Sequence, residues 1–165
     1  MTAAYVALGS NLGDPRRQVL EAVDALARLP RTRLLRRSHL YRTPPWGVLE
    51  QPQFVNAAAQ LETDLDPHAL LDALLAIEQR AGRVRAGRNG PRTLDLDLLH
   101  MEGVQCDEDR LTLPHPRIAE RAFVLLPLAD LAPDLVLPGQ GRVAELLAGT
   151  DTHGCERLAE SRLAE

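Results

Sequence analysis

The sequence predicts an α+β fold of the ferredoxin-like type, with the element order βαββαβ, and three observations lead to this prediction. Apolar runs of strand length stand near the N-terminus and after residue 93. Two segments with apolar residues at helical spacing each begin at an Asp-Pro pair. Two more strand-like segments lie between these helices. We therefore expect a four-stranded antiparallel sheet with both helices on one face, and later helices covering the other face or an edge.

The first strand and helix are predicted at the N-terminus. Residues 3–8 form an apolar run that ends in a Gly- and Asn-containing turn over residues 9–14. Asp14 before Pro15 is typical of a helix N-cap with proline in the first turn, and helical spacing continues until Pro30. The turn could bind a phosphate at the helix N-terminus, or it could be a plain tight turn.

The next two strands are predicted over residues 33–41 and 54–61. The segment between them, residues 42–52, is too long for a hairpin turn and too rich in proline for regular structure. A loop of this length inside a compact domain is usually functional or mobile. Trp46 in this loop is interpreted either as a lid residue that contacts a ligand or as a hydrophobic plug.

The second helix is predicted to begin at Asp66-Pro67 and to run towards Gly82, before a strand over residues 94–99. The remaining expected elements are a turn into a minor strand at 102–106, a short segment at 111–113, a helical segment over 118–131 interrupted at Pro127, and a helix over 143–147. Residues 1–150 are expected to form a single domain, and the polar tail at 151–165 is expected to fray.

Composition excludes several classes of protein. The chain of 165 residues has a net charge of −4, which argues against a general nucleic-acid binder, and all 19 of its basic residues are arginine. Without lysine it cannot carry a Walker-type phosphate loop. Cys106 and Cys155 have no paired spacing, so neither a disulfide nor a zinc site is implied. No apolar run reaches membrane-span length and the N-terminus lacks a secretion pattern, so a cytoplasmic protein without a membrane partner is expected. A monomer is expected as well, although neither of these observations bears on the number of subunits.

The stretch over residues 87–99 carries the strongest chemical signal. Residues two apart in a strand face the same side, so the leucines at alternate positions are expected in the core, and Asp95 and Asp97 together on the other face. Their Cα atoms would lie about 6.5 Å apart. Two carboxylates at that distance repel by roughly 2.5 kcal/mol at an effective dielectric near 20, and hard cations would turn this repulsion into attraction. The pair therefore predicts a magnesium site.

Four arginines precede this strand, at Arg83, Arg85, Arg88 and Arg92. Their planar guanidinium groups match phosphate oxygens two at a time. Carboxylates for metal next to arginines for phosphate describe a site for a magnesium nucleotide. The alternative is that the strand simply has one hydrated face and that the arginines belong to a solvated loop. The nucleotide site is favoured because the carboxylates and the arginines would bind parts of the same ligand.

Five motifs follow one another in the sequence. They are Ala-Leu-Gly-Ser-Asn-Leu-Gly at 7–13, Tyr-Arg-Thr-Pro-Pro at 41–45, Gln-Pro-x-Phe-Val-Asn-Ala at 51–57, Gly-Pro-Arg-Thr-Leu-Asp-Leu-Asp at 90–97, and Leu-Thr-Leu-Pro-His-Pro at 111–116 followed by Arg121-Ala122-Phe123. In this order the motifs resemble the 6-hydroxymethyl-7,8-dihydropterin pyrophosphokinase family, and the resemblance covers residues 3 to about 148. The resemblance implies a ferredoxin-like enzyme of folate biosynthesis that transfers the terminal diphosphate of ATP to the hydroxymethyl group of the pterin and releases AMP.

The resemblance also implies roles for individual residues. Asp95 and Asp97 would hold two Mg²⁺ ions, and Arg83 and Arg92 would be catalytic. The residues expected to bind ATP are Arg85, Arg88, Leu98, Arg110, Thr112, His115 and Arg121. The residues expected to bind the pterin are Thr43, Pro44, Pro45, Trp46, Phe54, Asn56 and Phe123, with the two phenylalanines on either side of the ring. For His115, capping of its loop between two prolines is the alternative to ATP contact.

The sequence departs from the family pattern at a few positions: the loop before Gly90 is one residue shorter, and Asn89, Leu75 and Phe54 replace a frequent tryptophan, glutamine and tyrosine. Two other functions stay open. One is a different magnesium-dependent nucleotidyl or phosphoryl transferase. The other is a module that binds single-stranded RNA, which would need exposed aromatic residues on adjacent strands and is disfavoured by the Leu-Asp alternation and the net charge.

Overall fold

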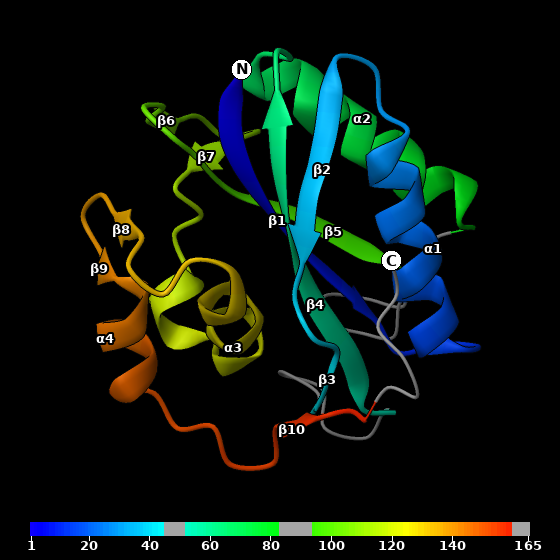
Figure 1. Ribbon diagram of the computed structural model, residues 1–165, viewed down its shortest axis with the longest axis vertical. Helices are drawn as coiled ribbons and strands as arrows, with labels where there is room; N and C mark the ends of the chain where they lie inside the picture. The colour runs from blue at the N-terminus through cyan, green and yellow to red at the C-terminus, as the bar shows by residue number, and fades with distance from the viewer. Residues whose placement is uncertain (45–51, 83–93, 160–165) are drawn as a thin grey trace.

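The computed structural model describes residues 1–44, 52–82 and 94–159. These residues form an antiparallel sheet with α-helices on both faces (Figure 1). The helices α1 (Pro15–Ala27) and α2 (Pro67–Arg80) lie on one face, and α3 (Ala122–Leu131) lies on the other, next to α4 (Val143–Ala148). The expected mixed fold with an antiparallel sheet and helices is therefore confirmed.

The sheet is built around two long central strands, β1 (Thr2–Ser10) and β4 (Phe54–Thr63), which pair along their full length. The strand β5 (Asp95–Met101) pairs with the other edge of β1. On the far edge of β4, β2 (Thr32–Arg37) pairs with one end and β3 (Tyr41–Thr43) with the other. All of these pairings are antiparallel.

The single strand expected over residues 33–41 is wrong, because the chain leaves the ladder between β2 and β3. The break is at Ser38, whose hydroxyl accepts a hydrogen bond from the backbone N–H of Ala58 at 2.8 Å and donates one to the carbonyl of His39 at 2.7 Å. The side chain thus takes the place of a backbone partner. Beyond the break, the Tyr41 hydroxyl donates to Asp130 at 2.9 Å and ties β3 to α3.

The two helices on the first face begin where the sequence predicts. The carboxylate of Asp14 accepts a hydrogen bond from the Arg17 N–H at 3.3 Å, and the carboxylate of Asp66 accepts one from the Ala69 N–H at 2.8 Å. Proline occupies the first turn of both helices. Their apolar sides pack with one face of the sheet into the larger hydrophobic core, which includes Leu26, Leu70 and Leu74 and the leucines at 94, 96 and 98.

A second core lies between the other face of the sheet and the C-terminal helices. The helical segment expected over residues 118–131 is interrupted at Arg121, which separates a 3₁₀ turn (Ile118–Glu120) from α3. The interruption expected at Pro127 is wrong, because α3 continues through that residue. Leu125, Pro127 and Leu128 are all buried, so packing compensates for the backbone hydrogen bond that proline cannot make.

Two small hairpins complete this part of the chain. One joins β6 (Cys106–Asp107) to β7 (Thr112–Leu113), and the other joins β8 (Val136–Leu137) to β9 (Gly141–Arg142). In the part of the chain that the structure describes, no helix is long and apolar enough to cross a membrane.

The tail does not fray throughout, contrary to expectation. The strand β10 (Glu156–Arg157) pairs with β3 at the edge of the sheet, and the N–H of Leu158 donates to the carbonyl of Leu40 at 2.8 Å. The segment is held by backbone hydrogen bonds, and these do not require the apolar side-chain pattern from which a strand could be predicted.

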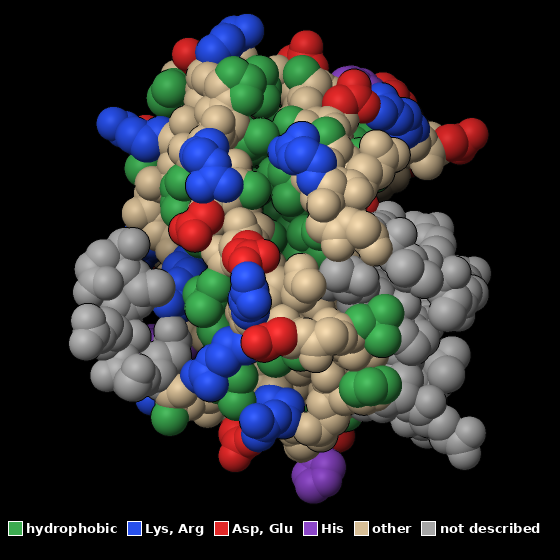
Figure 2. All heavy atoms as spheres, turned by 90° about the vertical axis from the view of Figure 1, so that its right-hand side faces the viewer, with side chains coloured by type: hydrophobic (Ala, Val, Ile, Leu, Met, Phe, Trp, Pro, Cys, Tyr) green, Lys and Arg blue, Asp and Glu red, His purple; other side chains and the backbone are tan. Residues whose placement is uncertain are grey.

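Charged side chains on the face shown in Figure 2 are of both signs and interspersed, with apolar side chains between them. Among the described residues of this face there is thus no single-sign patch.

Candidate functional site

A cavity of about 510 Å³ opens at the end of the sheet where β1, β4 and β5 meet the loop before α3. Six segments line it: the end of β1, the end of β3, the start of β4, part of α2, the start of β5, and residues within 115–124. A volume of this size is typical of small-molecule sites. The elements are far apart in the chain, so the site depends on the whole sheet.

The carboxylates of Asp95 and Asp97 line the cavity from β5. The leucines at 94, 96 and 98 are 1%, 5% and 4% exposed and belong to the larger core, so the expected alternation is present. Across the sheet, Asp95 pairs with Gly9 and Asp97 with Ala7 on β1. Because Gly9 has no side chain and Ala7 has only a methyl group, β1 leaves space next to the two carboxylates.

A third carboxylate at this cavity belongs to Glu78 of α2, which is 2% exposed. Its Oε2 accepts a hydrogen bond of 2.6 Å from the backbone N–H of Leu96, the residue between Asp95 and Asp97. A charge-assisted bond of this length is strong in a buried setting. Glu78 therefore connects α2 to β5 at the point where β5 presents its acidic pair.

Basic groups face the acidic pair from the loop before α3. Arg121 lines the cavity half-buried, and its guanidinium carbon lies 5.6 Å from the centre of the Phe123 ring. Burial lowers the pKa of Arg121, as does the neighbouring Arg117, while Asp97 and Asp95 oppose this shift. The guanidinium thus lies within the electrostatic influence of both carboxylates. Its Nε is buried without a hydrogen-bond partner among the described residues, which leaves a donor for a ligand.

His115 is fixed by its own loop and lines the same cavity. Its backbone N–H donates to the carbonyl of Leu99 at 2.8 Å, and its Nδ1 accepts from the Arg117 N–H at 3.2 Å. Burial foremost, and then the charges of Arg121 and Arg117, lower the pKa of His115 to about 4. The ring is therefore neutral at pH 7, and with Nδ1 accepting, Nε2 carries the proton and can donate.

The lining of the cavity also combines aromatic rings with a fixed amide. Phe54 and Phe123 both line it. Asn56 is 7% exposed, and its Oδ1 accepts a 2.5 Å hydrogen bond from the hydroxyl of Thr43. Its Nδ2 lies 3.5 Å from the carbonyl of Leu8. These contacts assign the orientation of the amide and give the pocket a rigid polar group between apolar surfaces.

The structure brings together nine of the residues predicted for the site. The cavity is lined by Thr43, Pro44, Phe54, Asn56, Asp95, Asp97, His115, Arg121 and Phe123. The predicted residues Pro45, Trp46, Arg83, Arg85, Arg88 and Arg92 lie outside the described residues.

Three predicted ATP-binding residues do not line this cavity. Leu98 is 4% exposed, and its side chain packs in the larger core. If Leu98 contacts a ligand, it therefore does so through its backbone. Arg110 and Thr112 both lie in the β6–β7 hairpin. Arg110 forms an ion pair with Asp72 of α2. The Thr112 hydroxyl lies 3.3 Å from the backbone carbonyl of Glu108.

Sequence reasoning missed the contribution of Arg117, although this residue directly follows the Pro-His-Pro motif. It also gave no role to Glu78, because the hydrogen bond from Leu96 joins residues 18 positions apart.

Comparisons with known proteins identify the class of enzyme, which is a pyrophosphokinase. The chain matches the family model described as 7,8-dihydro-6-hydroxymethylpterin-pyrophosphokinase (HPPK) over residues 5–133. It is 51% identical over 158 residues to the 2-amino-4-hydroxy-6-hydroxymethyldihydropteridine pyrophosphokinase of Methylorubrum extorquens, covering 96% of this chain and 99% of the relative. It is 56% identical over 154 residues to the Pseudomonas aeruginosa enzyme of the same name, covering 93% and 95%. The chain belongs to the HPPK family.

Solved structures agree on the fold. The Plasmodium falciparum HPPK-DHPS in complex with pteroate has a TM-score of 0.71 at 15% identity, over 90% of this chain and 42% of that chain. The same protein with SDX-DHP has a TM-score of 0.67 at 15% identity, over 90% of this chain and 43% of that one. The chain thus spans less than half the length of these structures, and at this identity they support the fold alone.

Proposed function

We propose that this chain transfers the β,γ-diphosphate of ATP to the hydroxymethyl group of 6-hydroxymethyl-7,8-dihydropterin, releasing AMP, as a step of folate biosynthesis. The observation that carries the proposal is one cavity lined both by a carboxylate pair and by two phenylalanines with a fixed amide. In the reaction, the pterin hydroxyl oxygen forms a bond to the β-phosphorus. The bond from that phosphorus to the oxygen of AMP breaks, and the hydroxyl proton is released.

The acidic pair fits magnesium. Asp95 and Asp97 offer hard oxygen ligands on one face of β5, and the opposing Gly9 and Ala7 leave space above them. We propose that these two carboxylates hold two Mg²⁺ ions. When bound, the ions would neutralise the phosphate oxygens and align them for in-line displacement. Glu78 would position the pair by accepting the Leu96 N–H.

Basic groups of the chain would hold the triphosphate. Arg121 supplies at the cavity an Nε–H that has no hydrogen-bond partner among the described residues, and His115 supplies a donor at Nε2. Arg83 and Arg92 are proposed as catalytic residues that offset developing charge. The remaining ATP contacts are proposed for Arg85, Arg88, Leu98, Arg110 and Thr112.

The pterin would lie at the aromatic side of the cavity. We propose that Phe54 and Phe123 stack on its two faces and that Asn56, held by Thr43, bonds its polar edge. Pro44 would line the same side, as proposed for Pro45 and Trp46. A flat heteroaromatic ring with donors and acceptors suits this combination.

The sheet order also supports a finer fold assignment. Strand β5 lies beside β1, β1 beside β4, and β4 beside β2 and β3. If β2 and β3 are counted as one interrupted strand, we infer the ferredoxin-like βαββαβ arrangement, with α3 and α4 added on the second face. A single catalytic domain over residues 1–150, a monomer and a cytoplasmic location are proposed with it.

The reaction is tested by incubating the protein with Mg²⁺, ATP and the hydroxymethyl dihydropterin. AMP formation that depends on the pterin is the expected result. Release of ADP, or AMP formation without pterin, would indicate the other magnesium-dependent transferase considered above.

Asp95→Asn and Asp97→Asn test the metal pair. Each is expected to lower kcat/KM by about a thousandfold, or ~4 kcal/mol of barrier, because a charged ligand of the metal site is lost. Circular dichroism should be unchanged because both side chains face the cavity. Asp109→Asn, at an exposed position, is the matched control. Near-normal turnover in either site variant would contradict the assignment.

A further inference from the structure

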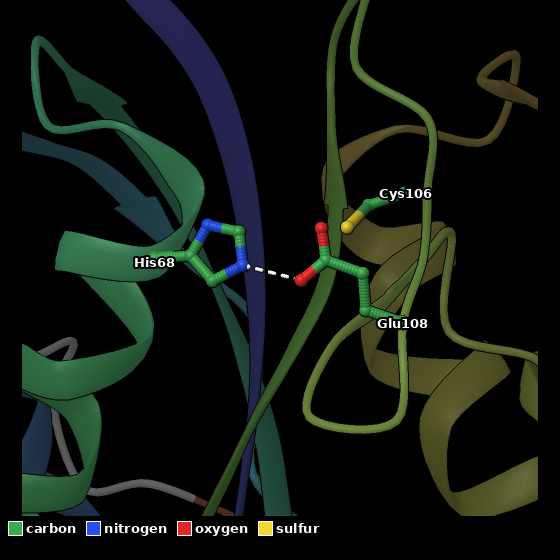
Figure 3. Close-up of side chains that lie close together, drawn as sticks. All are labelled: His68, Cys106 and Glu108. Carbon is green, nitrogen blue, oxygen red and sulfur yellow. Dashed lines mark hydrogen bonds and ion pairs between the residues drawn. The ribbon is translucent and has the colours of Figure 1, made fainter.

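A second group of potential metal ligands lies outside the cavity, between the first turn of α2 and the β6–β7 hairpin (Figure 3). His68 comes from α2, Cys106 from β6, and Glu108 from the turn that follows β6. One ligand atom from each residue lies within 4.8 Å of the other two. Figure 3 shows the three side chains pointing toward one another from the two elements.

Two of the three groups already interact. His68 Nε2 lies 2.8 Å from Glu108 Oε1, and the ligand atom of Cys106 lies within 4.8 Å of those of both other residues. His68 and Glu108 are 44% and 54% exposed at their side chains, so a cation in solution can reach them and both can adjust.

We propose that His68, Cys106 and Glu108 form a binding site for a divalent transition-metal ion, with zinc as the ion whose ligand preferences they match best. Imidazole nitrogen, thiolate sulfur and carboxylate oxygen are the three protein ligand types of zinc. Hard cations such as Mg²⁺ avoid thiolate, which separates this site chemically from the Asp95–Asp97 pair. Three protein ligands leave the fourth tetrahedral position to water.

The distances require only small movements. With bonds of about 2.0–2.3 Å to zinc, the ligand atoms of a tetrahedral site lie roughly 3.3–3.7 Å apart. The His68–Glu108 pair, at 2.8 Å, would open slightly as the metal enters between its atoms. The sulfur, within 4.8 Å of both other atoms, has at most about an ångström to close.

The charges balance in the bound state. A thiolate and a carboxylate carry two negative charges, a neutral imidazole adds none, and the sum cancels the two positive charges of the ion. The thiol must lose its proton on binding, so metal uptake releases a proton to solvent. Burial, with Glu108 next, raises the pKa of the Cys106 thiol in the metal-free protein, and the cation would reverse this preference.

A metal here would connect α2 to the β6–β7 hairpin. The same two elements are joined by the ion pair between Asp72 and Arg110. That hairpin carries Arg110 and Thr112, and a cross-link at its base would hold it against α2. Because the ligands come from two separate segments of the chain, metal binding would stabilise the folded arrangement of α2 and the hairpin.

The direct test is titration of the full chain with Co²⁺ under reducing conditions, without nucleotide. Co²⁺ bound through a thiolate gives a charge-transfer band in the near ultraviolet, and tetrahedral Co²⁺ gives intense visible bands. The wild-type chain is expected to show both and to lose them when Zn²⁺ is added, because zinc binds a site of this kind more tightly than cobalt.

Variants locate the site. Cys106→Ser should lose the charge-transfer band, and His68→Asn and Glu108→Gln should weaken Co²⁺ binding more than about 100-fold, since even outer partners of a metal site contribute 10- to 100-fold. Cys155→Ser is the matched control for the thiol and should keep the band. Asp97→Asn should also keep it, which separates this site from the proposed magnesium site.

A second measurement covers the case in which a variant folds poorly. Zn²⁺ should raise the Tm of the wild-type chain and of Cys155→Ser, but not that of Cys106→Ser or His68→Asn, because a ligand that binds only the folded state stabilises it. The proposal is overturned if the wild-type chain gives no thiolate band, if the band persists in Cys106→Ser, or if it disappears in Cys155→Ser. In those cases His68 and Glu108 form only an exposed hydrogen-bonded pair.

Discussion

At the scale of single residues, Glu78 is the point where the core meets the acidic pair. Its carboxylate accepts the Leu96 N–H at 2.6 Å and is buried. Glu78→Ala leaves that N–H without this acceptor, which costs about 1–3 kcal/mol of unfolding free energy. It should also lower kcat, because Asp95 and Asp97 then lose a fixed backbone between them. Urea denaturation and steady-state kinetics measure the two effects.

Glu78→Gln separates positioning from charge. A glutamine Oε1 can accept the same N–H, so this variant is expected to recover most of the stability and most of kcat. The exposed Glu145→Ala serves as the surface control. If Gln and Ala reduced kcat equally, the negative charge of Glu78 would matter rather than its hydrogen bond.

His115 makes stability depend on pH through its buried ring. Its pKa is lowered to about 4 in the folded protein from an ordinary value near 6.5, chiefly by burial. The unfolded chain therefore binds more protons in this range, and stability falls as pH decreases from about 6.5 to 4. Between pH 7 and pH 4.5 the loss from this group is on the order of 2 kcal/mol.

The measurement is urea unfolding of the ligand-free protein at both pH values. His115→Gln should show a smaller loss between pH 7 and pH 4.5 than the wild type, by about that amount. His100, which is also buried with a lowered pKa, keeps its contribution in both proteins and cancels in the difference. Equal losses in the two proteins would mean that the His115 ring is not desolvated.

At the scale of elements, the pairing of β1 with β4 sets the shape of the aromatic side of the cavity. A Cβ at Gly9 would lie 2.7 Å from Asn56 Nδ2, so Gly9→Ala must displace the amide. Because Asn56 is the polar group proposed for the pterin edge, KM for the pterin should rise about tenfold, or ~1.4 kcal/mol, with KM for ATP little changed. Steady-state kinetics with each substrate varied in turn measure this.

The control for this substitution is Gly149→Ala, where a new Cβ meets its nearest atoms at 3.8 Å. A double variant makes the test sharper. In an Asn56→Ala background Gly9→Ala should add little, because the clash has been removed and the two effects are coupled. Additive effects on KM would show that the methyl group acts in some other way.

The elements that the sequence predicted well are those specified by local patterns. Asp14 and Asp66 begin α1 and α2 because a cap needs only its own N-terminal turn. The Leu-Asp alternation of β5 is also local. Elements that depend on distant partners were missed: the break at Ser38 requires the Ala58 N–H, and β10 requires the free edge of β3.

The same distinction applies to the site. Asp95 and Asp97 could be predicted because two residues of one strand define their own geometry. The contact between Glu78 and Leu96 and the cluster of His68, Cys106 and Glu108 join segments far apart in the chain, and neither has a spacing that marks it. Only the folded sheet brings these groups together.

At the scale of the whole molecule, the C-terminal segment completes the edge of the sheet next to the residues proposed to bind the pterin. Strand β10 pairs with β3, Glu156 forms a 2.9 Å ion pair with Arg42, and the turn at Gly154 lies against Pro44, which lines the cavity. Gly154 has a φ of +83°, so its tight turn suits glycine. Two segments more than 100 residues apart in the chain thus lie together at the part of the cavity that Pro44 lines.

Ending the chain after Thr150 removes β10 and tests this support. Pro44 then loses the turn at Gly154 that lies against it, so KM for the pterin should rise about fivefold, or ~1 kcal/mol, while KM for ATP stays within about twofold. A shorter truncation after Ala159 keeps β10 and is expected to leave both values unchanged. Kinetics of the two truncated proteins at equal folded fraction, checked by circular dichroism, separate local support from general destabilisation. If the protein that ends after Thr150 had an unchanged KM for the pterin, β3 and Pro44 would keep their positions without β10.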